Sequence, residues 1–176
     1  MALAITGGCA ATLLPLVADM RESRDAPRSL VRLLRPGGAL ELTCRRHYEV
    51  LLLRSRGYAV AKRAAEVVAG ARERRLTDLF PLIGRTPGAS RQYLRWLVEV
   101  GLLTQVRKRY NFADPLLGLW AGLYLGRGGH PTDEEIRAAE EKFTSAQGEL
   151  SDLKAELARE TRNRELAERD ALNYSN

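Results

Sequence analysis

Residues 76–112 read LTDLFPLIGRTPGASRQYLRWLVEVGLLTQVRKRYNF, and their order of apolar and turn-forming residues predicts two consecutive helices. The first helix spans about 76–83 and ends at Gly84, because glycine readily adopts the left-handed conformation that closes a helix. A turn at Pro87 and Gly88 leads into the second helix, which runs to about residue 100. Its apolar residues recur every three or four positions, as expected for one buried face: Tyr93, Leu94, Trp96, Leu97 and Val100.

A short basic hairpin is predicted directly after the second helix. Leu102, Leu103 and Val106 lead into three consecutive basic residues, and apolar residues then alternate at Tyr110 and Phe112. Alternation on both sides of a polar turn is typical of two paired strands. Helix, turn, helix and hairpin in this order are typical of a winged helix-turn-helix, in which the hairpin is the wing. We therefore expect a mainly α fold with a small two-stranded wing.

Four segments are predicted along the 176 residues. Amphipathic stretches and a glycine-rich run divide the chain into a helical segment at 1–70, a winged helix-turn-helix domain with its closing helix at 71–125, a hinge at 126–131 and a long C-terminal helix at 132–176. Asp114 can cap the closing helix through its side-chain oxygens, and Pro115 suits the first turn of that helix.

The C-terminal helix is predicted to have a coiled-coil seam. Thr132 begins it with a capping box, because Glu135 follows three residues later. A seven-residue repeat follows, and we expect it to mediate oligomerisation through Ile136, Phe143, Leu150, Leu153 and Leu157. Self-pairing into a homodimer is the first interpretation, and pairing with a helical protein partner or folding back on the rest of the chain are the alternatives.

Charge is divided unevenly along the chain. Residues 1–131 carry 21 Lys and Arg against 10 Asp and Glu, whereas residues 132–176 carry 7 against 12. A basic segment suggests a polyanion as partner, although arginine-rich solvated faces have the same composition. Apolar runs stay well short of the roughly eighteen residues of a membrane span. With only Cys9 and Cys44, both expected to be buried thiols, the sequence favours a reducing cytoplasm.

Catalytic chemistry has no signature in the sequence. His47 and His130 are isolated, and paired carboxylates, a nucleophile with a base, or a metal-binding cluster are not apparent. The phosphate-binding pattern Gly-x-x-x-x-Gly-Lys-Ser/Thr is also missing. We therefore expect a protein that is not an enzyme, with no cofactor and no metal.

Several motifs together resemble the C-terminal portion of archaeal-type AAA ATPases, over about residues 5–125. In chain order they are Thr6-Gly7-Gly8, Arg54-x-Arg56-Gly57-Tyr58, Tyr93-Leu94 with Leu97-x-x-x-Gly101-Leu102, and Tyr110-x-Phe112-x-Asp114-Pro115 with Leu119-Trp120. The resemblance implies a small helical lid followed by a winged helix. It carries over no nucleotide chemistry, because the P-loop nucleotide-binding domain of the family is lacking.

The predicted function is nucleic-acid binding, with double-stranded DNA as the first choice. In this interpretation the second helix presents Ser90, Arg91, Gln92 and Arg95 to the major groove, while the wing places Arg107, Lys108 and Arg109 on flanking phosphate. Such a protein would be a transcriptional regulator or a DNA-associated accessory factor. The alternatives are a protein-docking module related to the ATPase C-terminus, and a factor that binds structured RNA or the ribosome. A purely structural interpretation of Arg95 is that it is a solvated partner of Glu99, four residues further on.

Overall fold

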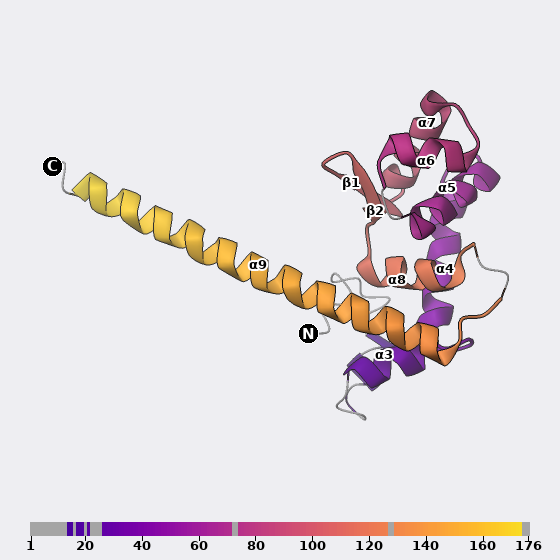
Figure 1. Cartoon of the computed structure of the whole chain (residues 1–176), viewed down its shortest axis with the longest axis horizontal. Coiled ribbons are helices and arrows are strands. Elements are labelled where there is room, and N and C mark those ends of the chain that lie inside the picture. Colours follow the sequence, from indigo (N-terminus) through magenta and orange to yellow (C-terminus); the bar gives the residue numbers. More distant parts are fainter. Residues whose placement is uncertain are drawn as a thin grey trace.

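One long helix extends from a body that consists of shorter helices and one hairpin (Figure 1). The structure is a computed structural model that describes residues 14–15, 17–19, 21, 26–71, 74–126 and 129–173. Residues 6–9, with the predicted glycine turn and Cys9, lie outside the described residues. In chain order the elements are α3 (Ala26–Leu34), α4 (Ala39–Arg54), α5 (Tyr58–Gly70), α6 (Leu76–Ile83), α7 (Pro87–Glu99), β1 (Leu103–Val106), β2 (Arg109–Phe112), α8 (Pro115–Tyr124) and α9 (Asp133–Asn173).

The predicted mainly α fold with a small two-stranded sheet is confirmed for these residues. The hydrophobic core draws side chains from α3 to α8 and from both strands, so residues on either side of position 70 pack as one body. Fully buried members include Leu30, Leu52, Leu79, Leu94 and Leu116. Trp120 of α8 lies among them, with its ring centroid 5.4 Å from that of Tyr48 in α4. The helix pair α6–α7 is therefore held on a rigid support.

Helix α6 ends as predicted, but α7 begins earlier than its apolar pattern suggested. Gly84 closes α6 in the left-handed conformation, with φ at 73°. Pro87 is the first residue of α7 rather than part of the turn, and the Thr86 hydroxyl oxygen caps the helix by accepting from the Ala89 amide at 3.3 Å. Proline is tolerated there because the first amides of a helix have no intrahelical acceptor.

The predicted hairpin is present, and its tip has an unusual backbone. Strands β1 and β2 are antiparallel, with Leu103 opposite Phe112 and Val106 opposite Arg109. The two-residue turn consists of Arg107 and Lys108, at φ values of 49° and 66°. Two successive positive φ values are typical of a type I′ turn, whose twist matches that of the flanking strands.

A third extended segment joins the hairpin from the chain just before α6. Arg75 forms an isolated antiparallel bridge with Arg109 of β2. The Tyr110 amide also donates to the Arg74 carbonyl oxygen at 2.8 Å. These contacts tie the start of α6 to the hairpin, so that α6, α7 and the strands hold fixed positions relative to one another.

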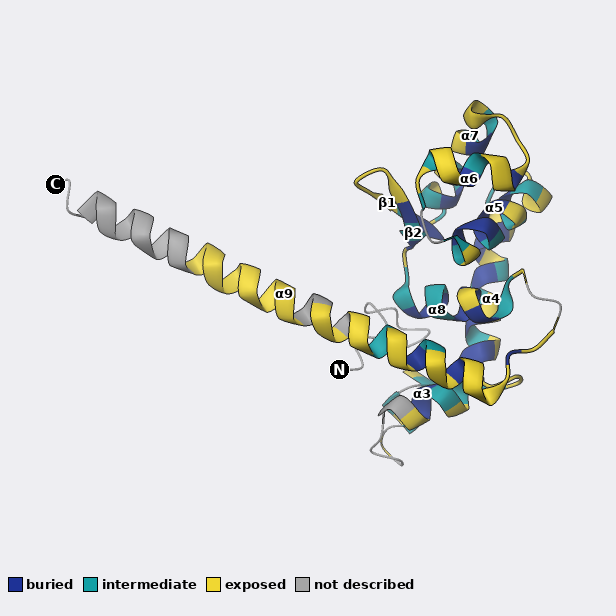
Figure 2. Ribbon diagram, viewed as in Figure 1, coloured by how far each residue is buried: buried dark blue, intermediate teal, exposed yellow. Residues whose placement is uncertain are grey.

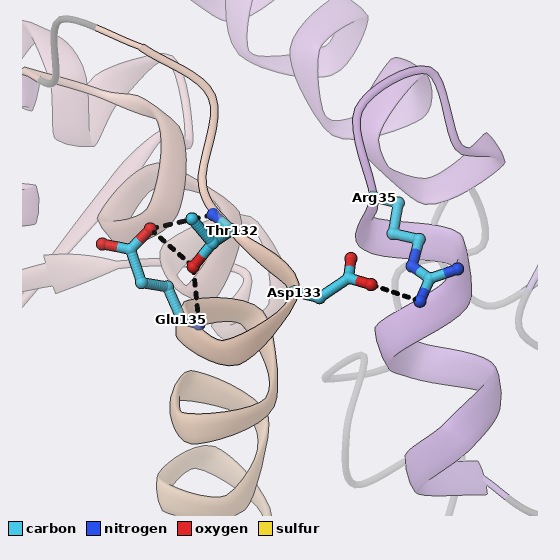
Figure 3. Close-up of polar contacts among 4 residues, drawn as sticks. All are labelled: Arg35, Thr132, Asp133 and Glu135. Carbon is cyan, nitrogen blue, oxygen red and sulfur yellow. Dashed lines mark hydrogen bonds and ion pairs between the residues drawn. The ribbon is translucent and has the colours of Figure 1, made fainter.

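The start of α9 has the predicted capping box (Figure 3). The Thr132 amide donates to Glu135 Oε2 at 2.9 Å, and the Glu135 amide donates to Thr132 Oγ1 at 3.3 Å. One residue further on, Asp133 accepts a hydrogen bond from Arg35 Nη2 at 2.5 Å. This ion pair joins the first turn of α9 to the end of α3.

The first turns of α9 fold back on the body, which corrects part of the predicted oligomerisation seam. Ile136 is completely buried, and Phe143 is partly buried against the same core. Both face the body because α9 packs beside α3 and α8. Ile136 is therefore wrong as a residue of an oligomer interface, and Phe143 has part of its surface covered by the body. Pro131 is also buried, so the predicted hinge ends inside the packed body.

Beyond this anchored part, α9 runs out into solvent (Figure 2). Every residue from 152 to 162 is exposed. Leu153 and Leu157 are 63% and 64% exposed, although both are apolar. The side chain of Leu150 is outside the described part of the chain, but the helix is continuous through it.

Candidate nucleic-acid interface

A groove lies between the start of α6, the middle of α7 and the hairpin. Its volume is about 610 Å³, and the residues that line it are Arg75, Leu76, Thr77, Arg91, Arg95, Val98, Gln105, Lys108 and Tyr110. Each wall comes from a different element. The strand contacts of Arg74 and Arg75 described above fix the distance between these walls. The groove is therefore a property of the tertiary fold and not of α7 alone.

Four of the lining residues are cations, and the lining contains no carboxylate. Arg75 comes from the start of α6, Arg91 and Arg95 from α7, and Lys108 from the hairpin tip. Neither Arg91 nor Lys108 makes an ion pair with any residue that the structure describes. Several like charges around one concave surface give it a positive potential that attracts polyanions.

Arg95 has partners on its own helix, as the alternative interpretation of the sequence predicted. Its Nε lies 3.5 Å from Glu99 Oε1, and its Nη2 donates to Gln92 Oε1 at 2.8 Å. The side chains of Arg95 and Glu99 are both more than half exposed, and such surface pairs contribute little free energy. An anionic ligand can therefore compete for the Arg95 guanidinium at low cost.

Tyr110 and Arg74 form the support behind the hairpin. Tyr110 is buried; burial raises the pKa of its phenol, and the nearby positive charge of Arg91 opposes that shift. Arg74 is half-buried, which lowers the pKa of its guanidinium, and its Nη1 donates to Asn111 Oδ1 at 2.9 Å. This hydrogen bond, together with the one from the Tyr110 amide to the Arg74 carbonyl oxygen, holds β2 against the segment before α6. They fix the orientation of the hairpin and with it the position of Lys108.

The structure brings three of the seven predicted nucleic-acid-binding residues into the groove, namely Arg91, Arg95 and Lys108. Arg107 and Arg109 are exposed nearby, at the hairpin tip and on β2, but they do not line it. Gln92 is half-buried, and its Oε1 accepts a hydrogen bond from Arg95. Gln105 and Tyr110 also line the groove, although they are not among the predicted binding residues. The alternation of the hairpin strands was the signal that could have placed them together on one face.

Ser90 is a wrong prediction, because it is completely buried. It lies four residues before Leu94 and seven before Leu97, which puts it on the buried face of α7. Its hydroxyl has no hydrogen-bond partner among the described residues. Ser90 therefore cannot reach a ligand in the groove, and the exposed face of α7 is the one that carries Arg91 and Arg95.

Replacing Ser90 by alanine is expected to stabilise the protein by about 1 kcal/mol. The variant removes an unpaired buried hydroxyl and raises helix propensity. Urea unfolding, followed by circular dichroism, measures the change. Thr86→Ala is the matched variant, because it removes a hydroxyl that does accept a hydrogen bond and should lower stability by about 1 kcal/mol. A loss of nucleic-acid affinity in Ser90→Ala would contradict the burial of this residue.

Three further findings concern the rest of the described chain. Among the residues that the structure describes, no group of three or more His, Cys, Asp and Glu side chains is placed to hold a metal ion. None of the described helices combines the length and the apolar composition needed to cross a membrane. The Cys44 side chain is buried, as predicted.

Comparison with known proteins adds no relative. Neither the family models, nor the curated proteins, nor the solved structures include a match to this chain.

Proposed function

We propose that the protein binds nucleic acid through a winged helix formed by α6, α7 and the β1–β2 hairpin. Duplex DNA is the proposed ligand. The observation that carries the proposal is the groove in which four cations from three elements converge without a carboxylate. We propose a binding role in the cytoplasm without catalysis, as a transcriptional regulator or DNA-associated accessory factor.

The order of the elements supports the assignment of a winged helix. The β1–β2 hairpin directly follows the helix pair, and Arg75, the residue before α6, forms a single isolated bridge to β2. Two consecutive helices followed by a hairpin are elements of a winged helix, with the hairpin as wing. The resemblance to the C-terminal part of archaeal-type ATPases rests on the same elements and stays a prediction.

The exposed face of α7 suits the major groove of DNA. Arg91 and Arg95 are one helical turn apart and both point away from the core. A single α-helix fits the major groove, where an arginine can make two hydrogen bonds to the edge of a guanine. Lys108 extends from the hairpin beside them. A lysine on a turn is suited to phosphate, because its point charge needs no fixed geometry.

The backbone of the hairpin tip also supports a charge-based role. Arg107 and Lys108 occupy left-handed conformations that cost a residue with a Cβ about 1 kcal/mol each relative to glycine. Asn-Gly is the sequence that fits this turn best. The chain instead places two cations there, beside a groove that already contains three arginines. Binding to phosphate would explain why basic residues occupy these two left-handed positions.

The salt dependence of duplex binding tests the role of the hairpin. In the variant Arg107→Asn with Lys108→Gly, both charges are lost while the turn receives its preferred residues. We expect weaker binding to all duplexes and a salt slope smaller by roughly two, about one for each lost phosphate contact. Fluorescence anisotropy with a pool of labelled duplexes at several salt concentrations measures both.

The matched control removes two arginines from a different surface. Arg46 and Arg54 are exposed on α4, and the double alanine variant should keep the affinity and the salt slope of the wild-type protein. Equal slopes for wild-type protein and hairpin variant would rule out phosphate contacts by the hairpin. Tighter binding to structured RNA than to any duplex in the pool would assign the groove to RNA.

Protein docking is the second candidate, favoured by an exposed apolar stripe on α4. Leu42, Val50 and Leu53 are 51%, 47% and 72% exposed, and their spacing places them on one side of the helix. Exposed apolar residues that cluster are typical of interaction surfaces. If the wild-type protein binds neither duplex DNA nor structured RNA, this function replaces the first.

A further inference from the structure

The outer half of α9 presents a seam that the other described parts of the chain leave uncovered. The helix is 41 residues long, and only its first turns contact α3 and α8 (Figure 1). Leu153 and Leu157 are exposed and lie four residues apart, on one side of the helix. An isolated helix is only marginally stable in water, and leucines exposed along one side favour association.

The seven-residue repeat continues through this outer half. Counting from Ile136 as position a, Leu150 and Leu157 are also at position a, while Ala146 and Leu153 are at position d. Ile136 and Phe143 already pack on the body. The repeat therefore changes its role along the helix, from intramolecular packing near the body to an open seam beyond it.

We propose that residues 146–160 of two copies of this chain form a parallel, in-register two-stranded coiled coil. The occupant of the open seam is thus a second copy of α9. The proposal does not depend on nucleic-acid binding, because the seam lies on the part of α9 beyond its contacts with the body. In a parallel pair the two bodies lie at the same end of the coiled coil.

The flanking charges select the parallel orientation. Glu149 and Glu156 occupy position g, and Lys154 occupies position e; all three are exposed. In a parallel pair, position g of one helix faces position e of the next heptad in the other, which places Glu149 beside Lys154 of the second copy. In an antiparallel pair, g faces g, so that glutamates would face glutamates. Charges at e and g are known to set partner choice and orientation.

Charge reversal at this pair is the test. Sedimentation equilibrium of the full chain, without nucleic acid and over a range of concentrations, gives the dimer dissociation constant. The wild-type protein should be a dimer. Glu149→Lys and Lys154→Glu should each weaken it roughly ten-fold or more, because two symmetry-related attractions become repulsions. The double variant should restore the wild-type value, since the pair is then reversed but complementary.

The matched control is Asp152→Lys, at the outward position c of the same heptad, which should leave the dissociation constant unchanged. All these side chains are exposed, so the variants should fold like the wild-type protein. A monomeric wild-type protein would overturn the proposal. Tighter association of Glu149→Lys would indicate an antiparallel pair and would overturn it too, as would equal weakening by Asp152→Lys.

Discussion

Replacing Arg91 by alanine is expected to lower affinity for the preferred duplex by about 1–3 kcal/mol, provided that this residue contacts a guanine. Arg91 lies on the exposed face of α7, lines the groove and has no ion pair among the described residues. Its guanidinium therefore has no ion pair with a described residue to break before binding. The same variant should accept other base pairs at the position that Arg91 contacts, because alanine makes no hydrogen bond to the base edge.

Arg91→Lys separates base recognition from simple charge. Lysine keeps the positive charge but lacks the planar fork that forms two parallel hydrogen bonds. This variant should lose the base preference and keep the salt slope of the wild-type protein. Binding to a randomised duplex library, sequenced after selection, measures the preference at each position. An unchanged preference in Arg91→Lys would show that Arg91 does not read a base.

Replacing Ile136 by alanine is expected to lower the free energy of unfolding by about 2–5 kcal/mol, the usual cost of removing a large buried aliphatic side chain. Ile136 is completely buried, although it belongs to the helix that extends from the body. The substitution leaves a cavity between α9 and the core, and thus reports on the anchoring of this helix. Urea unfolding followed by circular dichroism gives the value.

A graded series makes this test specific. Ile136→Val removes one methylene group and should cost about 0.5–1.5 kcal/mol. The large and the small effect together distinguish a packed site from a loosely covered one. If both variants unfold like the wild-type protein, then α9 does not pack on the body, and Ile136 returns to the oligomerisation seam.

Local signals in the sequence predicted local structure well. Gly84 ends α6, Asp114 caps α8 by accepting from the Leu116 amide at 2.8 Å, and Thr132 with Glu135 forms the capping box. Each depends on residues only a few positions apart. The start of α7 was missed because Pro87 was interpreted as a turn residue, whereas Thr86 beside it supplies a cap that suits proline at the first position.

Contacts between residues far apart in the chain were harder to predict from the sequence. The bridge between Arg75 and Arg109, which joins two walls of the groove, links residues far apart in the chain and has no sequence pattern of its own. The heptad repeat of α9 showed which residues share a face but not what covers that face. Ile136 and Leu157 fit the same repeat, yet the body buries one and leaves the other exposed. Which of them packs depends on the position of α3 and α8.

The most direct test of the groove as a nucleic-acid interface is amide chemical-shift mapping by NMR during titration with unlabelled duplex DNA. The expected result is that the largest changes fall on the exposed face of α7, on the hairpin tip and at Arg75. The amides of α4 and of the outer half of α9 should stay unchanged. Largest changes on α4, or no change in any of these elements at saturating duplex, would contradict the proposed function.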